Sequence, residues 1–202
     1  GDGVHFVTVR EVGGSNAATF TVLIDDTPPA VLVSSPRNGQ FVVATDDAPI
    51  AAYDCLDSGS GPATCSGTVA VGQPVSMMPG TQTFSVGATD FAGNLAPGVT
   101  NSYYVVEPVS IASPLDPVSI EGPVTISGRA TDLSEFAETI TVDWGDGTAP
   151  EVLNGVSVAN FTAEHVYAGP NIYRVTVTVD YEGAFRQQAV SDFVVVYDPT
   201  GG

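Results

Sequence analysis

The chain has 202 residues, with 23 acidic side chains against 5 basic ones and a formal net charge of -18. All five basic residues are arginine, which excludes lysine Schiff-base chemistry and the lysine of a phosphate-binding loop. So acidic a chain lacks the basic face that binds nucleic-acid phosphates or an anionic membrane surface. No apolar run is long enough to span a bilayer. The hydrophobic fraction of 43% is nevertheless sufficient for a folded core.

Short apolar runs rich in Val, Thr, Ile, Tyr and Phe, each closed by turn residues, follow one another along the chain and predict an all-β fold. Alternation is clearest in RVTVTVD, where Val175, Val177 and Val179 point to one side. No segment holds a helical period. Strands this short and regular indicate antiparallel sandwiches or barrels. The expected strands are 4–10, 19–24, 30–34, 41–44, 50–53, 68–71, 83–88, 102–106, 109–112, 124–130, 139–144, 156–163, 173–181 and 189–197.

Two proline-rich stretches, 24–31 and 107–117, predict junctions because proline cannot continue a strand ladder. The expected segments are therefore 1–28, 29–107 and 108–202. The first segment repeats the pattern of 83–108, namely a strand, an acidic turn with Gly and Asn, and a second strand. We interpret residues 1–28 as the last two strands of a preceding repeat. Since the chain opens at Gly1 in the middle of that pattern, we expect it to be an excised or processed piece.

The two cysteines, Cys55 and Cys65, are separated by the turn-prone stretch LDSGSGPAT. Thiols placed in this way can meet across a short loop, which predicts a disulfide and an oxidising, extracellular setting. A pair of reduced thiols in a cytosolic protein is the alternative. A zinc site would need further ligands, and His5 and His165 are the only histidines.

Two groups of motifs carry a resemblance to known families. The first comprises TPP, SPRNGQFV, YDCLDSGSGPATCSG and GTQTFSVGATDFAGN, and residues 29–107 thereby resemble the tandem Ig-like repeats of bacterial secreted and cell-surface proteins. The second comprises TISGRATD, VDWGDGT, EHVYAGPNIYRVTVTV and VVVY, and residues 108–202 resemble the polycystic kidney disease (PKD) domain. The resemblance implies tandem antiparallel β-sandwiches, Ig-like and then PKD-like. It also implies a spacer, adhesion unit or accessory module of an extracellular protein.

The WGDG motif, Trp144–Gly147, has two interpretations. As a tight turn, it uses Gly145 and Gly147 for positive φ and Asp146 to accept nearby amide hydrogen bonds. Trp144 then fills the core or covers one end of the sandwich. The other interpretation is a tryptophan that faces a carbohydrate. Turn chemistry explains every residue of the motif and is the one we favour.

No nucleophile motif accompanies His165, so we expect this histidine to pack or hydrogen-bond at the strand end before Tyr167. Tyr173 precedes the long alternating strand and is expected to tie down a loop through its hydroxyl. The acidic residues single out no pair for glycoside hydrolysis, and we expect no enzyme. Asn160 begins a formal N-glycosylation triplet, Asn-Phe-Thr.

Acidic residues near the junctions are the candidate metal ligands. Calcium takes six to eight oxygen ligands, which carboxylates at a junction can supply. Since no EF-hand motif is present, this prediction rests on acid density alone, and solvated acids with Asx-turns are the alternative. The predicted ligands are Asp25, Asp26, Asp54, Asp57 and Asp90.

These patterns together predict a non-catalytic extracellular structural or adhesive module, part of a larger surface or filament-forming protein. Its expected partners are neighbouring domains or copies of itself, without nucleic acid or membrane insertion. Because an isolated hairpin is marginal in water, residues 1–28 are expected either to add as strands to a neighbour or to be a truncated repeat. The alternative function is a ligand- or carbohydrate-binding accessory module of a secreted hydrolase, which would need a row of exposed aromatic side chains.

Overall fold

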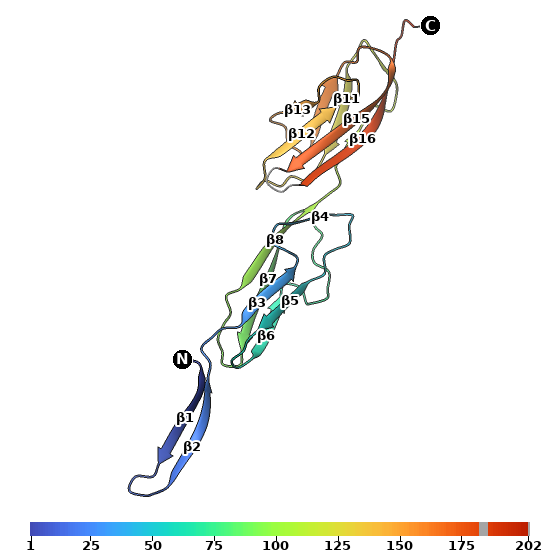
Figure 1. Cartoon of the computed structure of the whole chain (residues 1–202). Coiled ribbons are helices and arrows are strands. Elements are labelled where there is room, and N and C mark those ends of the chain that lie inside the picture. The colour runs from blue at the N-terminus through green and yellow to red at the C-terminus, as the bar shows by residue number, and fades with distance from the viewer. Residues whose placement is uncertain (182–185, 202) are drawn as a thin grey trace. The chain divides into compact units, whose positions relative to one another are not determined.

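The computed structural model describes residues 1–181 and 186–201. This part of the chain is all-β, with strands and turns and no helix, so the predicted fold class is confirmed (Figure 1). Within the same residues, there is accordingly no helix of the length and apolarity needed to cross a membrane.

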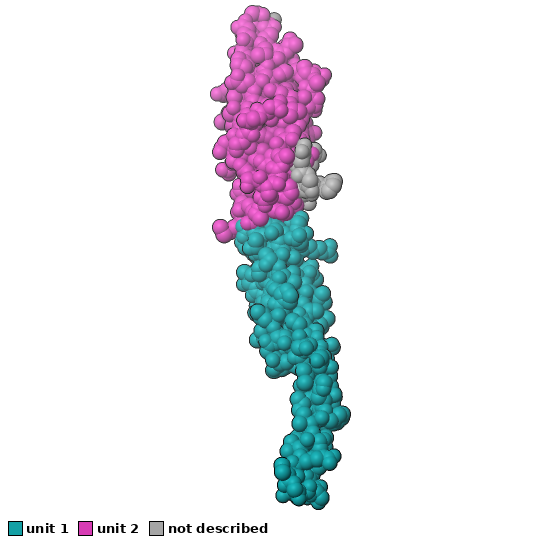
Figure 2. All heavy atoms as spheres, turned by 90° about the vertical axis from the view of Figure 1, so that its left-hand side faces the viewer, with its two compact units in different colours: residues 1–40, 48–76, 82–103 teal, residues 41–47, 77–81, 104–202 magenta. Residues whose placement is uncertain are grey.

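The chain folds as two compact units, coloured separately in Figure 2. Unit 1 comprises residues 1–40, 48–76 and 82–103, and unit 2 comprises residues 41–47, 77–81 and 104–202. Residues 41–47 belong with unit 2 because Phe41 packs against the rings of Tyr104, Phe136 and Tyr181. The division into segments 1–28, 29–107 and 108–202 stays a prediction.

Unit 1 begins with a hairpin of β1 (Gly3–Arg10) and β2 (Ala17–Ile24), which form a sheet of their own. The strands pair antiparallel without a bulge, from Gly3 opposite Ile24 to Arg10 opposite Ala17. The hairpin connection is closed by hydrogen bonds between Glu11 and Asn16, including one from the Asn16 amide to the Glu11 carboxylate.

Two further sheets follow the hairpin. One contains β3 (Ala30–Ser35) and β5 (Ala52–Leu56), and the other has the order β4 (Gln40–Val43), β8 (Val99–Val106), β7 (Gly80–Asp90) and β6 (Pro62–Gly67). Buried Phe84, Val86 and Tyr103 supply the core on the four-stranded side.

The prediction of a strand at 68–71 was wrong, because the strand is β6, at 62–67. Its sequence PATCSG has turn-forming character, yet Cys65 lies opposite Ala88 and Gly67 opposite Val86 in the ladder with β7. Pairing with β7 therefore outweighs the local preference of this stretch. The strand expected at 50–53 lies at Ala52–Leu56 instead.

The sandwich of unit 2 pairs β9 (Ser110–Ala112), β11 (Val124–Arg129) and β14 (Phe161–His165) in one sheet. The other sheet has the order β10 (Val118–Ser119), β16 (Arg186–Tyr197), β15 (Asn171–Tyr181), β12 (Glu138–Asp143) and β13 (Glu151–Leu153). This strand order is that of an Ig-like sandwich. The expected strand at 156–163 was too long, since residues 156–160 form a turn before β14.

The core of unit 2 lies between its two sheets. Val175, Val177 and Val179 are fully buried, as the alternation of β15 requires. They pack with inward side chains from both sheets, among them Val124, Ile126, Ile140, Val142, Phe161, Tyr181, Val194 and Val196.

Candidate functional site

Three acidic residues converge at the junction between the hairpin and the sandwich of unit 1. Asp25 lies just beyond β2, Asp57 just beyond β5, and Asp90 at the end of β7. One carboxylate oxygen from each lies within 4.8 Å of the other two. Among the described residues, Asp25, Asp57 and Asp90 are the one set of three or more His, Cys, Asp or Glu side chains whose potential ligand atoms lie this close together.

Backbone amides hold these carboxylates in place. The Ser60 N–H donates to Asp25 at 2.6 Å, and the Gly61 N–H donates to Asp57 at 2.5 Å. The Ser60 hydrogen bonds keep the pKa of Asp25 below its usual value. A Cβ at Gly59 would lie 2.5 Å from the Asp25 carboxylate, so a larger residue there would have to displace this side chain.

Asn94 joins the third carboxylate to the junction. Its side-chain amide donates to the carbonyl oxygen of Asp25 at 3.0 Å and to the carboxylate of Asp90 at 2.8 Å. Asp90 is only 3% exposed. The junction between β2 and β3 is therefore tied to two loops of the sandwich through hydrogen bonds to Asp25.

The two other predicted ligands lie outside the group. Asp54 accepts the N–H of the neighbouring Cys55, and Asp26 is hydrogen-bonded to Asp2, which raises the pKa of Asp26. Asp2 in turn accepts the N–H of Asp26 and the hydroxyl of Thr27. Three carboxylates of the predicted five are thus close enough to share a cation. Calcium binding stays a prediction.

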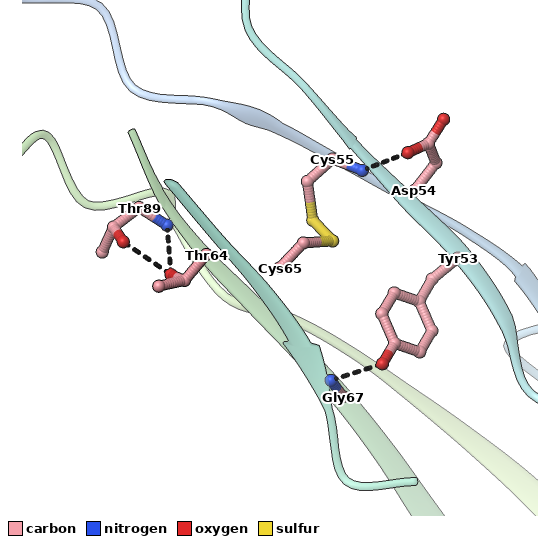
Figure 3. The surroundings of a disulfide bond; sticks show 7 residues. All are labelled: Tyr53, Asp54, Cys55, Thr64, Cys65, Gly67 and Thr89. Carbon is pink, nitrogen blue, oxygen red and sulfur yellow. Dashed lines mark hydrogen bonds between the residues drawn. A yellow bond between two sulfur atoms is a disulfide. The ribbon is translucent and has the colours of Figure 1, made fainter. Parts of the chain in front are cut away.

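The predicted disulfide is confirmed, but it links different elements from those expected. Cys55 in β5 bonds to Cys65 in β6, and these strands belong to separate sheets (Figure 3). A second link is adjacent, because the Gly67 N–H donates to the Tyr53 hydroxyl at 2.9 Å. The bond therefore connects the two sheets of the sandwich, where the sequence predicted only a pinned loop.

The WGDG motif forms a turn in which an aspartate is paired with a histidine. His165 Nε2 lies 2.8 Å from Asp146 Oδ2, and the His165 ring stacks on Trp144 at 4.9 Å between centroids. Partial burial acts to raise the pKa of Asp146, but hydrogen bonds from Thr148 and His165 outweigh it and lower the pKa to about 2. Trp144 is 2% exposed and its indole N–H donates to Glu151, so this ring has no free face for a sugar.

Two tyrosines complete this cluster. The hydroxyl of Tyr167 donates to the carbonyl of Trp144 at 2.9 Å, and burial raises the pKa of Tyr167. Tyr173 stacks on Tyr167, and its hydroxyl donates to the Gly169 carbonyl four residues upstream. Gly145 has a positive φ of 74°, and a Cβ there would overlap the Arg174 carbonyl. The cluster holds one end of β12 against β15.

Asn160 is exposed immediately before β14. It borders a shallow pocket of about 440 Å³ over the three-stranded sheet, which is also lined by Ser127, Arg129 and Thr162. The middle residue of the triplet, Phe161, is buried in the core. Glycosylation of Asn160 stays a prediction.

Sequence reasoning missed the difference between the two faces of the hairpin. Residues opposite each other in an antiparallel pair share a face, so the register separates the side chains into two sets. We call the first set the apolar face; it comprises His5, Val7, Val9, Ala18, Phe20, Val22 and Ile24. We call the second the mixed face; it comprises Val4, Phe6, Thr8, Arg10, Ala17, Thr19, Thr21 and Leu23.

The apolar face is uncovered. Phe20 is 56% exposed, and Val7, Val9, Val22 and Ile24 are all exposed as well. In an ordinary sandwich this is the side that packs against a second sheet. The alternation within each strand was visible in the sequence. Which residues of β1 share a face with which residues of β2 depends on the register.

A second group of exposed apolar side chains lies on the outer face of β15 and β16. We call it the β15–β16 patch; it comprises Ile172, Phe193, Val195 and Tyr197. Ile172 lies opposite Val195, and Arg174 lies opposite Phe193. Phe193 is 62% exposed, and no ion pair to Arg174 is found among the described residues.

The sequence matches no protein-family model and no curated protein. Among solved structures, the D00-D0 domain of intimin is similar at 11% identity and a TM-score of 0.44, over 84% of this chain and 100% of that one. The fibronectin(III)-like modules of Clostridium thermocellum CbhA are similar at 12% identity and a TM-score of 0.29, over 84% of this chain and 94% of that one. The N-terminal four Ig domains of Dscam1 isoform 7.44 are similar at 10% identity and a TM-score of 0.37, over 88% of this chain and 51% of that one. Since these TM-scores are below 0.5, the chain's own strand order is what identifies the Ig-like sandwich.

Proposed function

We propose that this chain is a non-catalytic extracellular structural module, part of a larger surface or filament-forming protein. The observation that carries the proposal is the Cys55–Cys65 bond between the two sheets of unit 1. Disulfides persist in oxidising compartments and are rare in the cytosol. A bond that joins the two halves of a sandwich suits a domain that works outside the cell.

The histidine cluster supports a structural role. A histidine that activates a nucleophile needs a hydroxyl or thiol within hydrogen-bond reach. Among the described residues, the side chain hydrogen-bonded to the His165 ring is the Asp146 carboxylate, and the ring is stacked on Trp144. This arrangement connects a turn to a strand end and serves stability.

The surface charge supports an exported role as well. A net charge of -18 keeps copies of a protein apart and in solution, and it favours contact through regions where the charge is absent. Within the hairpin, residues 3–24 carry one arginine and one glutamate and so have no net charge. We propose that neighbouring domains or copies make contact through residues 1–28, by strand addition or by packing of the apolar face.

The extracellular assignment is tested by labelling the producing cells with an antibody against this chain before and after permeabilisation. Labelling of intact cells and thiols that resist alkylation in the mature protein are the expected results. Labelling that requires permeabilisation, together with two alkylatable cysteines, would refute the proposal.

The alternative function, a carbohydrate-binding accessory module, has one observation in its favour. Phe193 and Tyr197 are exposed on the same face of β16. A pull-down on insoluble polysaccharides tests it, and retention of the wild type but not of Phe193→Ala would favour this alternative over a purely structural module.

A further inference from the structure

We propose that Asn154 is a site of spontaneous deamidation in the folded protein, through attack by the backbone nitrogen of Gly155 on the Asn154 side chain. This covalent modification does not depend on the proposed function. The inference comes from the two Asn-Gly pairs of the chain, Asn38–Gly39 and Asn154–Gly155, which are the same dipeptide in sequence but differ in the structure.

The reaction closes a succinimide ring. The Gly155 nitrogen gives up its proton to solvent base and forms a bond to Cγ of Asn154, and the side-chain nitrogen leaves as ammonia. Water then opens the ring at either of its carbonyls, which gives an aspartate or an isoaspartate. The net change is hydrolysis of an amide, so water is the only co-reactant. Glycine favours the attack because it has no Cβ that would crowd the ring.

The attacking nitrogen is accessible at Gly155. This residue lies in the loop after β13, beyond the ladder pair of Leu153 with Ile140. Asn154 and Gly155 are both exposed, so solvent base and water reach them. Over the residues that the structure describes, the Gly155 N–H makes no hydrogen bond. The Asn154 side chain donates from its NH₂ group to the carbonyl of Val152 at 3.1 Å, which leaves its own carbonyl oxygen to water.

The attacking nitrogen is held in place at Gly39. Its N–H donates to the Ser102 carbonyl at 2.7 Å, and the Ser102 N–H donates to the Asn38 side-chain oxygen at 2.9 Å. A bond from the Gln40 N–H to the Arg37 carbonyl at 3.1 Å closes the turn that contains this pair. Ring closure therefore requires these bonds to open first, although Asn38 and Gly39 are also exposed. Hydrogen bonding, and not exposure, separates the two pairs.

Deamidation would change the edge of the five-stranded sheet. β13 is the outermost strand and pairs with β12 alone. An aspartate at position 154 is ionised at neutral pH and cannot donate to the Val152 carbonyl. An isoaspartate also lengthens the main chain directly after β13. We therefore expect faster amide exchange in β13 of the modified chain, and no change in β15 on the other side of β12.

The experiment is prolonged incubation of the full chain at neutral pH, in native buffer and in strong denaturant. Digestion at acidic pH, where the reaction is slow, and mass spectrometry then measure the replacement of NH₂ by OH at each asparagine. In native buffer we expect Asn154 to react at least about tenfold faster than Asn38, because the bonds around Gly39 must open. In denaturant, where neither pair is protected, this advantage should disappear.

Two matched variants and the product pattern test the mechanism. Asn154→Gln should abolish the modification at position 154, because glutamine would have to close a larger and slower ring. Asn38→Gln should leave the modification of Asn154 unchanged. Both aspartate and isoaspartate should appear at position 154, since direct hydrolysis of the side chain by water gives aspartate alone.

Other results would overturn the inference. Equal rates at the two pairs in native buffer, or a faster reaction at Asn38, would show that the hydrogen bonds of Gly39 do not control the site. Aspartate without isoaspartate would exclude attack by Gly155. An advantage of Asn154 that persists in denaturant would mean that neighbouring residues, and not the fold, select it. All of these outcomes leave the proposed function intact, because cell-surface labelling tests that function separately.

Discussion

Reduction of the Cys55–Cys65 bond is the perturbation with the clearest expected size. The bond spans a sequence separation of 10 residues. In the chain-entropy description, opening a loop of this length returns about 2.7 kcal/mol of conformational freedom to the unfolded state. A loss of this size corresponds to a fall of roughly 10–20 °C in the midpoint of a small domain.

The structure adds a spatial restriction to this prediction. The bond lies in unit 1, whereas the only tryptophan, Trp144, lies in unit 2. Calorimetry of the oxidised chain, the reduced chain and the Cys55→Ala/Cys65→Ala variant should therefore show one transition shifted downward. Tryptophan fluorescence, recorded on the same samples, should show a second transition that moves little.

Two outcomes would refute this reasoning. A midpoint change below about 4 °C would mean that the bond contributes less than about 1 kcal/mol and that loop closure is not its main effect. An equal shift of the tryptophan transition would mean that the bond stabilises the whole chain as one cooperative unit. Agreement between the reduced chain and the alanine variant controls for side effects of the reductant.

Three further predictions follow from the site. Gly145→Ala should lower the free energy of unfolding by at least about 3 kcal/mol, because the position combines a positive φ with an overlap with the Arg174 backbone. Urea unfolding followed by tryptophan fluorescence measures this change. Gly147→Ala, with a positive φ but open space around it, should cost only about 1–2 kcal/mol. The pKa of Asp146 is lowered from 3.8 to about 2 on folding, so its stabilisation is present above pH 3.8 and is lost as the pH falls toward 2. Asp146→Asn should remove this acid dependence, which amounts to up to about 2 kcal/mol in the free energy of unfolding. If calcium binds at the junction, calcium at 100 times its Kd should stabilise unit 1 by about 2.7 kcal/mol, and Asp57→Asn should abolish the effect while Asp26→Asn should not.

Each of these three has a contrary result. Equal costs for the two glycine substitutions would mean that the carbonyl of Arg174 moves away without penalty. Parallel acid-unfolding curves for wild type and Asp146→Asn would show that the pair with His165 contributes nothing. An unchanged midpoint after addition of calcium and of chelator would refute the cation prediction.

The strands were predictable wherever a strand carries its own alternation. Residues 171–181 and 186–197 include two such strands, and the register of the structure agrees with them. β6 was missed because PATCSG has little β propensity and becomes a strand only by pairing with β7. β10 and β13, of two and three residues, were also missed, whereas the equally short β9 falls within the expected strand 109–112.

The metal-ligand prediction was also limited by what strand pairing brings together. Acid density selected five aspartates, but the fold brings together only Asp25, Asp57 and Asp90. These residues follow β2, follow β5 and end β7, so their distance depends on how three strands pair and where each one stops. Asp54 lies outside this group, and its carboxylate accepts the N–H of the neighbouring Cys55.

The amino-acid order by itself determined the all-β class, the two cysteines that bond and the turn chemistry of WGDG, because each depends on neighbouring residues or on a period of two. Only the tertiary structure decided that the disulfide joins two sheets, that three carboxylates meet, and that Val7, Val9, Phe20, Val22 and Ile24 share one face of the exposed hairpin. Those properties depend on strand register and sheet order, which bring together residues that are distant in sequence.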